Sequence, residues 1–199
     1  MTEKPDVKAG QQIYVSGPGM STNADLEQFM RMLGEATEKI KGNYFQLSVW
    51  NADRVYRERV YAYELYHQLR CVWGSFNFSL NGEVDKSGHE WFSRGRYASA
   101  KPDLIVHKPG YKDGNLVVVE IKQFSGRFLN DLEKLTWFCE DEHLPNYIRG
   151  IFLVYGNNVT EEAVRKKVQG AAKRSKKIKF NKVEVLCHLR VGHRAMKIM

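Results

Sequence analysis

The segment LVVVEIK, residues 116–122, decides the fold, because four consecutive apolar residues run directly into a glutamate and a lysine. Such a run is typical of a central strand that is covered on both faces. Glu120 and Lys122 stand two positions apart, so their side chains project to the same face of the sheet. Charged groups at the end of a buried strand are costly to desolvate without partners, and the segment therefore predicts a functional site.

A partner strand is predicted at residues 101–106, KPDLIV, which begins with Pro102-Asp103. If this strand pairs beside residues 116–122, Asp103, Glu120 and Lys122 converge. Two carboxylates suit a hard cation such as Mg²⁺, and a neighbouring lysine supplies a base or a positive charge. The alternative is a plain ion pair on a half-exposed strand, with Asp103 incidental. The apolar run before Glu120 argues against that alternative.

Pro102-Asp103 followed by Glu120-Ile121-Lys122 resembles the signature of the PD-(D/E)XK nuclease superfamily, and the resemblance covers roughly residues 52–190. It implies an α/β fold with a restriction-endonuclease-like mixed central sheet flanked by helices, to which the N-terminal residues add a helical extension. Residues 1–50 would form an N-terminal arm and helix. Residues 51–199 would form the nuclease-like domain, ending in a basic helix and a strand.

The resemblance further implies a metal-dependent endonuclease that hydrolyses DNA phosphodiester bonds, with Mg²⁺ as cofactor and Mn²⁺ as a substitute. The expected metal ligands are Asp103, Glu120 and the main-chain carbonyl of Ile121. Lys122 would orient or deprotonate the attacking water, or stabilise the developing charge. Some members of the family carry a glutamine directly after the lysine, so Gln123 is included among the expected catalytic residues.

The family also places a glutamate on a helix before the core strands. A helix is predicted for residues 51–73, with Asn51 as its N-cap and an apolar stripe facing inward. Glu64 lies beside that stripe and is the expected fourth acidic group, as a further catalytic residue and metal ligand. Glu58 is its rival for the same role, and a surface carboxylate is the alternative for Glu64.

Positive charge is concentrated at the C-terminal end of the chain. Residues 160–199 hold twelve Lys and Arg against three acids, whereas residues 1–159 hold nineteen against twenty. A cationic surface of this kind attracts polyphosphates, which predicts a nucleic acid partner, DNA first, although a solvated basic helix is the alternative. The candidate nucleic-acid-binding residues are Arg94, Arg96, Arg165, Lys166, Lys173, Arg174, Lys176 and Lys177.

Local signals predict the remaining elements. Thr22 and Asp25 have the spacing of a capping box before a helix, and Thr160 is placed to cap a basic helix that runs to about residue 172. A further helix is expected over residues 127–142, and strands over residues 148–155 and 183–189. Asn81-Gly82 predicts a tight hairpin turn.

Other features limit the choice of function. The three cysteines are scattered, no histidine has metal-ligand spacing, and no apolar run is long enough for a membrane span, which predicts a cytoplasmic protein. A homodimer would suit cleavage of both strands of a duplex. Two other hypotheses compete: a catalytically inactive, nuclease-like DNA- or RNA-binding subunit, and a module that binds protein or membrane through its basic end.

Overall fold

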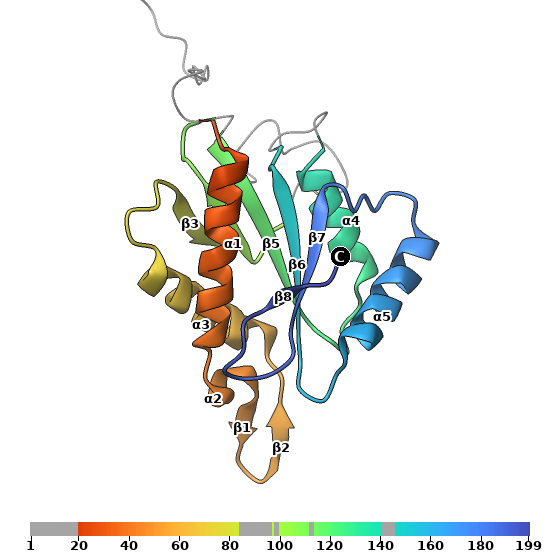
Figure 1. Cartoon of the computed structure of the whole chain (residues 1–199). Coiled ribbons are helices and arrows are strands. Elements are labelled where there is room, and N and C mark those ends of the chain that lie inside the picture. The colour runs from red at the N-terminus through yellow and green to blue at the C-terminus, as the bar shows by residue number, and fades with distance from the viewer. Residues whose placement is uncertain (1–19, 84–96, 98–99, 112–113, 141–145) are drawn as a thin grey trace, which may run out of the picture.

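The computed structural model describes residues 20–83, 97, 100–111, 114–140 and 146–199. It shows a mixed α/β fold in which helices flank a six-stranded sheet (Figure 1). Its elements are, in chain order, α1 (Asn23–Glu38), α2 (Gly42–Phe45), β1 (Leu47–Val49), β2 (Ala52–Val55), α3 (Glu58–Val72), β3 (Ser79–Gly82), β4 (Leu104–His107), β5 (Asn115–Gln123), α4 (Leu129–Phe138), β6 (Arg149–Tyr155), α5 (Glu161–Arg174), β7 (Val183–His188) and β8 (Met196–Lys197).

The large sheet has the strand order β3-β4-β5-β6-β7-β8. Its middle pairs, β5 with β6 and β6 with β7, are parallel, and the outer pairs are antiparallel. The parallel connections run through α4 and α5, as a parallel pair requires a crossover. A separate two-stranded sheet, β1 with β2, forms a hairpin directly before α3.

Two hydrophobic cores lie on opposite faces of the sheet. Val117, Val119 and Ile121 pack on the face covered by α1 and α3, whereas Val118 packs on the face covered by α4 and α5. This alternation follows from the two-residue period of side chains in a strand. The interior of β5 is therefore buried on both faces, as the apolar run predicted.

The N-terminal helix α1 shares the first of these cores. The capping box is confirmed, because the Thr22 hydroxyl oxygen accepts from the Asp25 main-chain N–H and Asp25 accepts from the Thr22 main-chain N–H. Phe29 and Leu33 of α1 are fully buried in the cluster that includes β5 residues. In the described part of the chain, no helix combines the length and apolar character needed to cross a membrane.

Two local predictions are wrong. Asn51 does not cap a helix: it has φ of 52° and lies in the turn of the β1–β2 hairpin, where Val49 pairs with Ala52. Asparagine tolerates this left-handed conformation, so the turn is as natural a place for it as a helix cap. Helix α3 begins seven residues later, at Glu58.

The second wrong prediction is the tight turn at Asn81-Gly82. Both residues belong to β3 and pair with Ile105 and Leu104 of β4, and the left-handed residue is Glu83, with φ of 44°. Pairing along the edge of the sheet therefore outweighs the local turn preference of the Asn-Gly pair.

Candidate active site

The candidate site lies where β5 extends past the end of β4. Pairing between the two strands ends at Leu104 opposite Val119, and β5 continues to Gln123. Continued register would bring Pro102 opposite Ile121, but proline has no N–H to donate to a ladder. The last residues of β5 therefore leave main-chain groups on the β4 side without a strand partner from β4.

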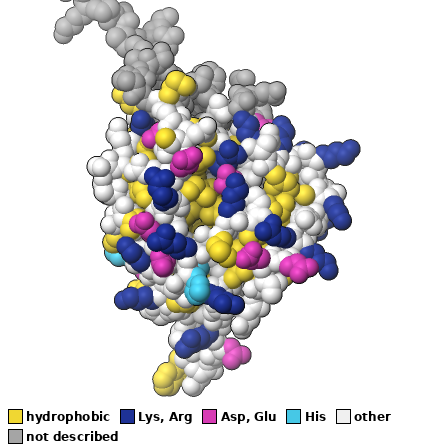
Figure 2. Space-filling view, in the orientation of Figure 1, with side chains coloured by type: hydrophobic (Ala, Val, Ile, Leu, Met, Phe, Trp, Pro, Cys, Tyr) yellow, Lys and Arg dark blue, Asp and Glu magenta, His cyan; other side chains and the backbone are white. Residues whose placement is uncertain are grey.

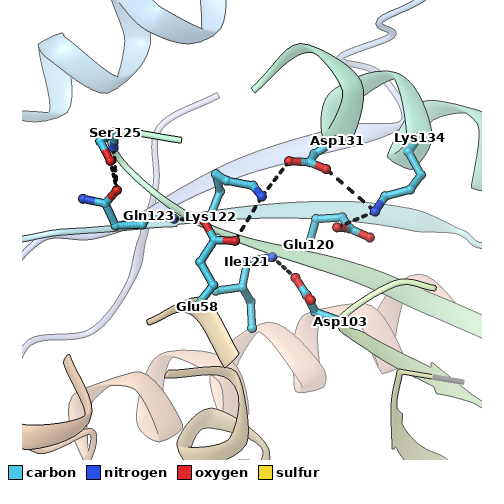
Figure 3. A network of polar contacts seen from close by, with 9 residues as sticks. All are labelled: Glu58, Asp103, Glu120, Ile121, Lys122, Gln123, Ser125, Asp131 and Lys134. Atoms are coloured by element: carbon cyan, nitrogen blue, oxygen red, sulfur yellow. Dashed lines mark hydrogen bonds and ion pairs between the residues drawn. The ribbon is translucent and has the colours of Figure 1, made fainter. Parts of the chain in front are cut away.

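Two carboxylates take the place of the missing strand. Asp103 Oδ2 accepts a hydrogen bond from the Ile121 main-chain N–H at 2.7 Å. Glu58 Oε1, at the start of α3, accepts from the Gln123 main-chain N–H at 3.1 Å. Figure 3 shows both carboxylates beside the last residues of β5. The loop before β4 and the first turn of α3 are thereby fixed on the same short stretch of strand.

Lysines from β5 and α4 connect the carboxylates into one network. Lys122 Nζ lies 3.1 Å from Glu58 Oε2 and 3.1 Å from Asp131 Oδ2. Lys134 Nζ lies 2.7 Å from Glu120 Oε2 and 3.7 Å from Asp131 Oδ1 (Figure 3). Side chains from α3, β5 and α4 thus meet at one end of the sheet.

Burial changes the charge state of Glu120. The side chain is almost fully buried, and this burial, together with the nearby Asp103 carboxylate, raises the pKa of Glu120 to about 8 despite Lys134. Burial also raises the pKa of Asp103, although the hydrogen bond from Ile121 works in the opposite direction. A positive charge beside these two carboxyl groups would lower both pKa values and favour their ionised forms.

Neighbouring charges, rather than burial, decide the pKa of Lys122. Burial alone would lower the pKa of Lys122, but the Asp131 and Glu58 carboxylates outweigh that effect, and the pKa is raised. The side chain is therefore a cation at neutral pH. It can donate hydrogen bonds and stabilise negative charge without first having to gain a proton.

The acidic pair fits a divalent cation, although no ready-made cluster is present. Among the described residues, no group of three or more His, Cys, Asp or Glu side chains is arranged to hold a metal. However, Glu120 Oε1, near Asp103, is buried and has no hydrogen-bond partner among the residues that the structure describes. The Ile121 carbonyl points to the same edge as its N–H. Mg²⁺ commonly takes one or two carboxylates and keeps several waters, which this donor set allows.

The structure brings together Asp103, Glu120, Ile121 and Lys122, as the sequence predicted. Gln123 joins the network through its main-chain N–H, while its side-chain Oε1 accepts from the Ser125 main-chain N–H at 2.9 Å and from the Ser125 hydroxyl.

Of the two rival glutamates, Glu58 lies in the network and Glu64 does not. Glu64 is buried further along α3, where its Oε1 accepts a hydrogen bond from Gln68 at 2.8 Å. Glu58 instead bonds both the lysine and the main chain at the end of β5.

Asp131 and Lys134 were not predicted. Both lie on α4, each one position before a buried leucine, and so at the border of the face that packs on the sheet. The helix that follows the Glu-x-Lys strand covers the face of the sheet that carries Glu120 and Lys122, but the sequence alone did not show which face it would cover. Nor could it specify which border residues reach them.

A pocket of about 610 Å³ opens beside Glu58 and Asp103 on the α3 side. Glu58 and Asp103 form part of its wall, and Tyr63, Tyr66 and Asn81 lie further along it. Glu58 and Asp103 are therefore accessible from a surface depression that can admit part of a ligand, whereas Glu120 is buried outside it.

The candidate nucleic-acid-binding residues divide into two groups. Arg94 and Arg96 lie outside the described residues. On and after α5, Lys166, Lys173, Lys176 and Lys177 are exposed, and Figure 2 shows Lys and Arg side chains over this side of the molecule. Two residues also have internal bonds: Arg165 donates to the Ile198 carbonyl, and Arg174 Nε donates to the Gly170 carbonyl at 3.2 Å.

Comparisons with known proteins identify no relative of this chain: no protein-family model, no curated protein and no solved structure matches it.

Proposed function

We propose that this chain is a metal-dependent endonuclease that hydrolyses DNA phosphodiester bonds on a restriction-endonuclease-like fold. The observation that supports the proposal best is the convergence of Asp103, Glu120 and Lys122 at the end of β5, where β4 stops. An isolated surface ion pair would not bury Glu120 or place an unpaired carboxylate oxygen beside Asp103.

Asp103, Glu120 and the Ile121 carbonyl would hold Mg²⁺, and Mn²⁺ would substitute. When bound there, the ion supplies charge stabilisation at the scissile phosphate and lowers the pKa of a water. Glu120 must lose its proton to serve as a ligand, because protonation leaves only a weak acceptor. Lys134, 2.7 Å from Glu120 Oε2, keeps that carboxylate in place.

Lys122 would orient the attacking water and stabilise negative charge on the phosphate. Its raised pKa argues against a role as the base that accepts the proton. The carboxylates of Glu58 and Asp131 fix its ammonium from two sides, each at 3.1 Å. Glu58 therefore takes the role expected of a helical glutamate, as a positioning residue for Lys122 and for the end of β5.

The substrate class follows from charge. The exposed lysines on and after α5 suit contact with phosphates, which supplies affinity without base specificity. Contacts of this kind position a protein on DNA but do not read its sequence. We therefore propose recognition of DNA structure, or action within a larger complex. The homodimer stays a prediction.

The test is cleavage of fluorescent single strands, duplex, flap, four-way junction and RNA with Mg²⁺, Mn²⁺ or EDTA. Metal-dependent cleavage by the wild type should be lost in Asp103→Asn and in Lys122→Ala, while DNA binding survives. Glu58→Gln should lower cleavage, whereas Glu64→Gln, a matched change on the same helix, should not. Full cleavage by Lys122→Ala would refute the proposal.

A second candidate function is a catalytically inactive, nuclease-like nucleic-acid-binding subunit. Lys122 and Lys134 each lie within 4 Å of two carboxylates, so internal ion pairs offset part of the negative charge of the site without a metal. Binding of DNA without cleavage under every metal, together with an absence of Mn²⁺ binding by calorimetry, would favour this candidate.

A further inference from the structure

The β1–β2 hairpin exposes an apolar tip that the fold does not use. Trp50 lies in the turn of this hairpin and is 90% exposed. Nine large hydrophobic side chains are exposed in the described part of the chain, and Tyr44, Leu47, Val49 and Trp50 are four of them. Figure 1 shows the hairpin projecting from the body of the molecule, and Figure 2 shows apolar atoms at the end of that projection. An exposed tryptophan grouped with other apolar side chains marks an interaction site.

The base of the hairpin is firmly anchored. Tyr56, just after β2, accepts from the Asn157 main-chain N–H at 2.9 Å, and Asn157 Nδ2 donates to Gln46 Oε1, just before β1, at 3.3 Å. Phe45 beside it is fully buried, with its ring edge-on to Tyr155. Both ends of the hairpin are therefore held on the turn after β6, so the tip is presented in a fixed direction at little entropic cost.

The hairpin also adjoins the candidate active site. Strand β2 ends at Val55, three residues before Glu58, which bonds Lys122 and the end of β5. Three residues of chain span roughly 10 Å at most. A ligand that reaches Lys122 and Glu58 is therefore close enough to contact the hairpin as well.

The surrounding charge favours an anionic partner. Lys39 and Lys41 precede the hairpin, Arg54 and Arg57 lie in it or just after it, and all four are exposed. Asp53 is the one acidic residue in residues 39–57. A tryptophan among cations suits nucleic acid, in which bases stack on aromatic rings and phosphates pair with Lys and Arg.

We propose that Trp50 stacks on an unstacked base of DNA and that the hairpin thereby directs the protein to branched or locally unpaired DNA. The inference rests on the proposed nuclease function and names its substrate class. In continuous duplex both faces of each base are covered, and separating a base step costs about as much as one aromatic stack returns. Stacking by Trp50 is therefore favourable on balance only where a base face is already open, as at a junction, flap or gap.

The test measures binding in EDTA, so that it does not depend on catalysis. Anisotropy compares a four-way junction and a flap with unbranched duplex of the same sequence. Trp50→Ala should weaken binding to the branched DNAs by about 5- to 100-fold, the usual worth of one base stack, and change duplex binding less than about twofold. Trp50→Phe should retain most of the affinity. A 2-aminopurine at the branch point should change fluorescence with wild type and Trp50→Phe but not with Trp50→Ala.

A matched control is Tyr111→Ala, an exposed aromatic in the loop before β5, at the opposite end of that strand from the site. It should bind branched DNA as the wild type does. Equal affinity of Trp50→Ala and wild type for the junction would overturn the inference, and so would equal losses on junction and duplex. Trp50-dependent binding to phosphatidylserine vesicles, with no binding to DNA, would also overturn it and the nuclease proposal with it.

The two proposals can fail separately. Junction binding that needs Trp50 but never leads to cleavage would refute the nuclease function and support the hairpin's role. Metal-dependent cleavage of junctions that does not depend on Trp50 would support the nuclease function and refute the hairpin's role.

Discussion

Replacement of Glu120 by glutamine should stabilise the protein while it removes metal binding. Glu120 is 3% exposed, and its pKa of about 8 compares with an ordinary value of 4.5. A carboxyl group whose pKa is higher in the folded state favours unfolding when it is ionised. Its destabilising effect is absent below pH 4.5, grows as the pH rises toward 8, and is complete above pH 8.

The magnitude follows from that pKa difference. At about 1.4 kcal/mol per pH unit, ionisation of Glu120 in the unfolded chain lowers the free energy of unfolding by roughly 3 kcal/mol at pH 7 and by about 1 kcal/mol at pH 5. Glutamine keeps an acceptor for Lys134, but its amide group does not reproduce the carboxyl group at the 2.7 Å contact, which offsets part of the gain. We therefore expect a net gain of about 2 kcal/mol at pH 7, which raises Tm by roughly 4 to 8 °C for a chain of this length.

Thermal and urea unfolding of wild type and Glu120→Gln, without divalent cations, would measure this gain at pH 5, 7 and 8.5. The gain should increase with pH. Glu64→Gln is the control, because Glu64 is also a buried glutamate but bonds Gln68 outside the site. A gain that is equal at all three pH values, or a loss of stability at pH 8.5, would show that Lys134 keeps Glu120 ionised and that the reasoning is wrong.

Two other predictions concern the same site. The apparent association constant of Mn²⁺, measured by calorimetry without DNA, should fall about tenfold per pH unit below pH 8, because the proton competes for Glu120; a constant affinity between pH 6 and 8 would contradict this. Gly126→Ala should lower cleavage by tenfold or more, since the new Cβ would lie 2.6 Å from Lys122 Cδ and displace that side chain. The control Gly170→Ala has open space around its Cβ and should leave cleavage intact while it stabilises α5 by up to about 1 kcal/mol. Equal activity of both alanine variants would show that the position of Lys122 is unimportant.

Much of the fold could be predicted because its signals are local. Four apolar residues in succession identified β5, and the helix caps at Thr22 and Thr160 are present as their side chains suggested. The hairpin at residues 47–55 escaped prediction for a physical reason. Asn51 suits a helix cap and a left-handed turn equally well, and the choice depends on the anchoring of Gln46 and Tyr56 on a turn about 100 residues away.

The same error explains which glutamate enters the site. With a helix starting at residue 51, Glu58 would lie two turns inside it, and Glu64 would be a reasonable candidate. Because the hairpin delays the start of α3, Glu58 becomes its first residue and lies next to the open edge of β5. Asp131 and Lys134 were missed because the crossing of α4 over β5 is a property of packing, which local sequence patterns do not encode.

Pro102 gives the Pro-Asp pair its physical meaning. If β4 continued, its residue opposite Ile121 would both accept from the Ile121 N–H and donate to the Ile121 carbonyl. Proline cannot donate, so pairing stops at Leu104, and the Asp103 carboxylate satisfies the N–H instead. Beside this contact, Glu120 Oε1 is buried without a hydrogen-bond partner among the described residues. One imino acid thus ends a strand and leaves the Asp103 carboxylate to accept the hydrogen bond that β4 would otherwise accept.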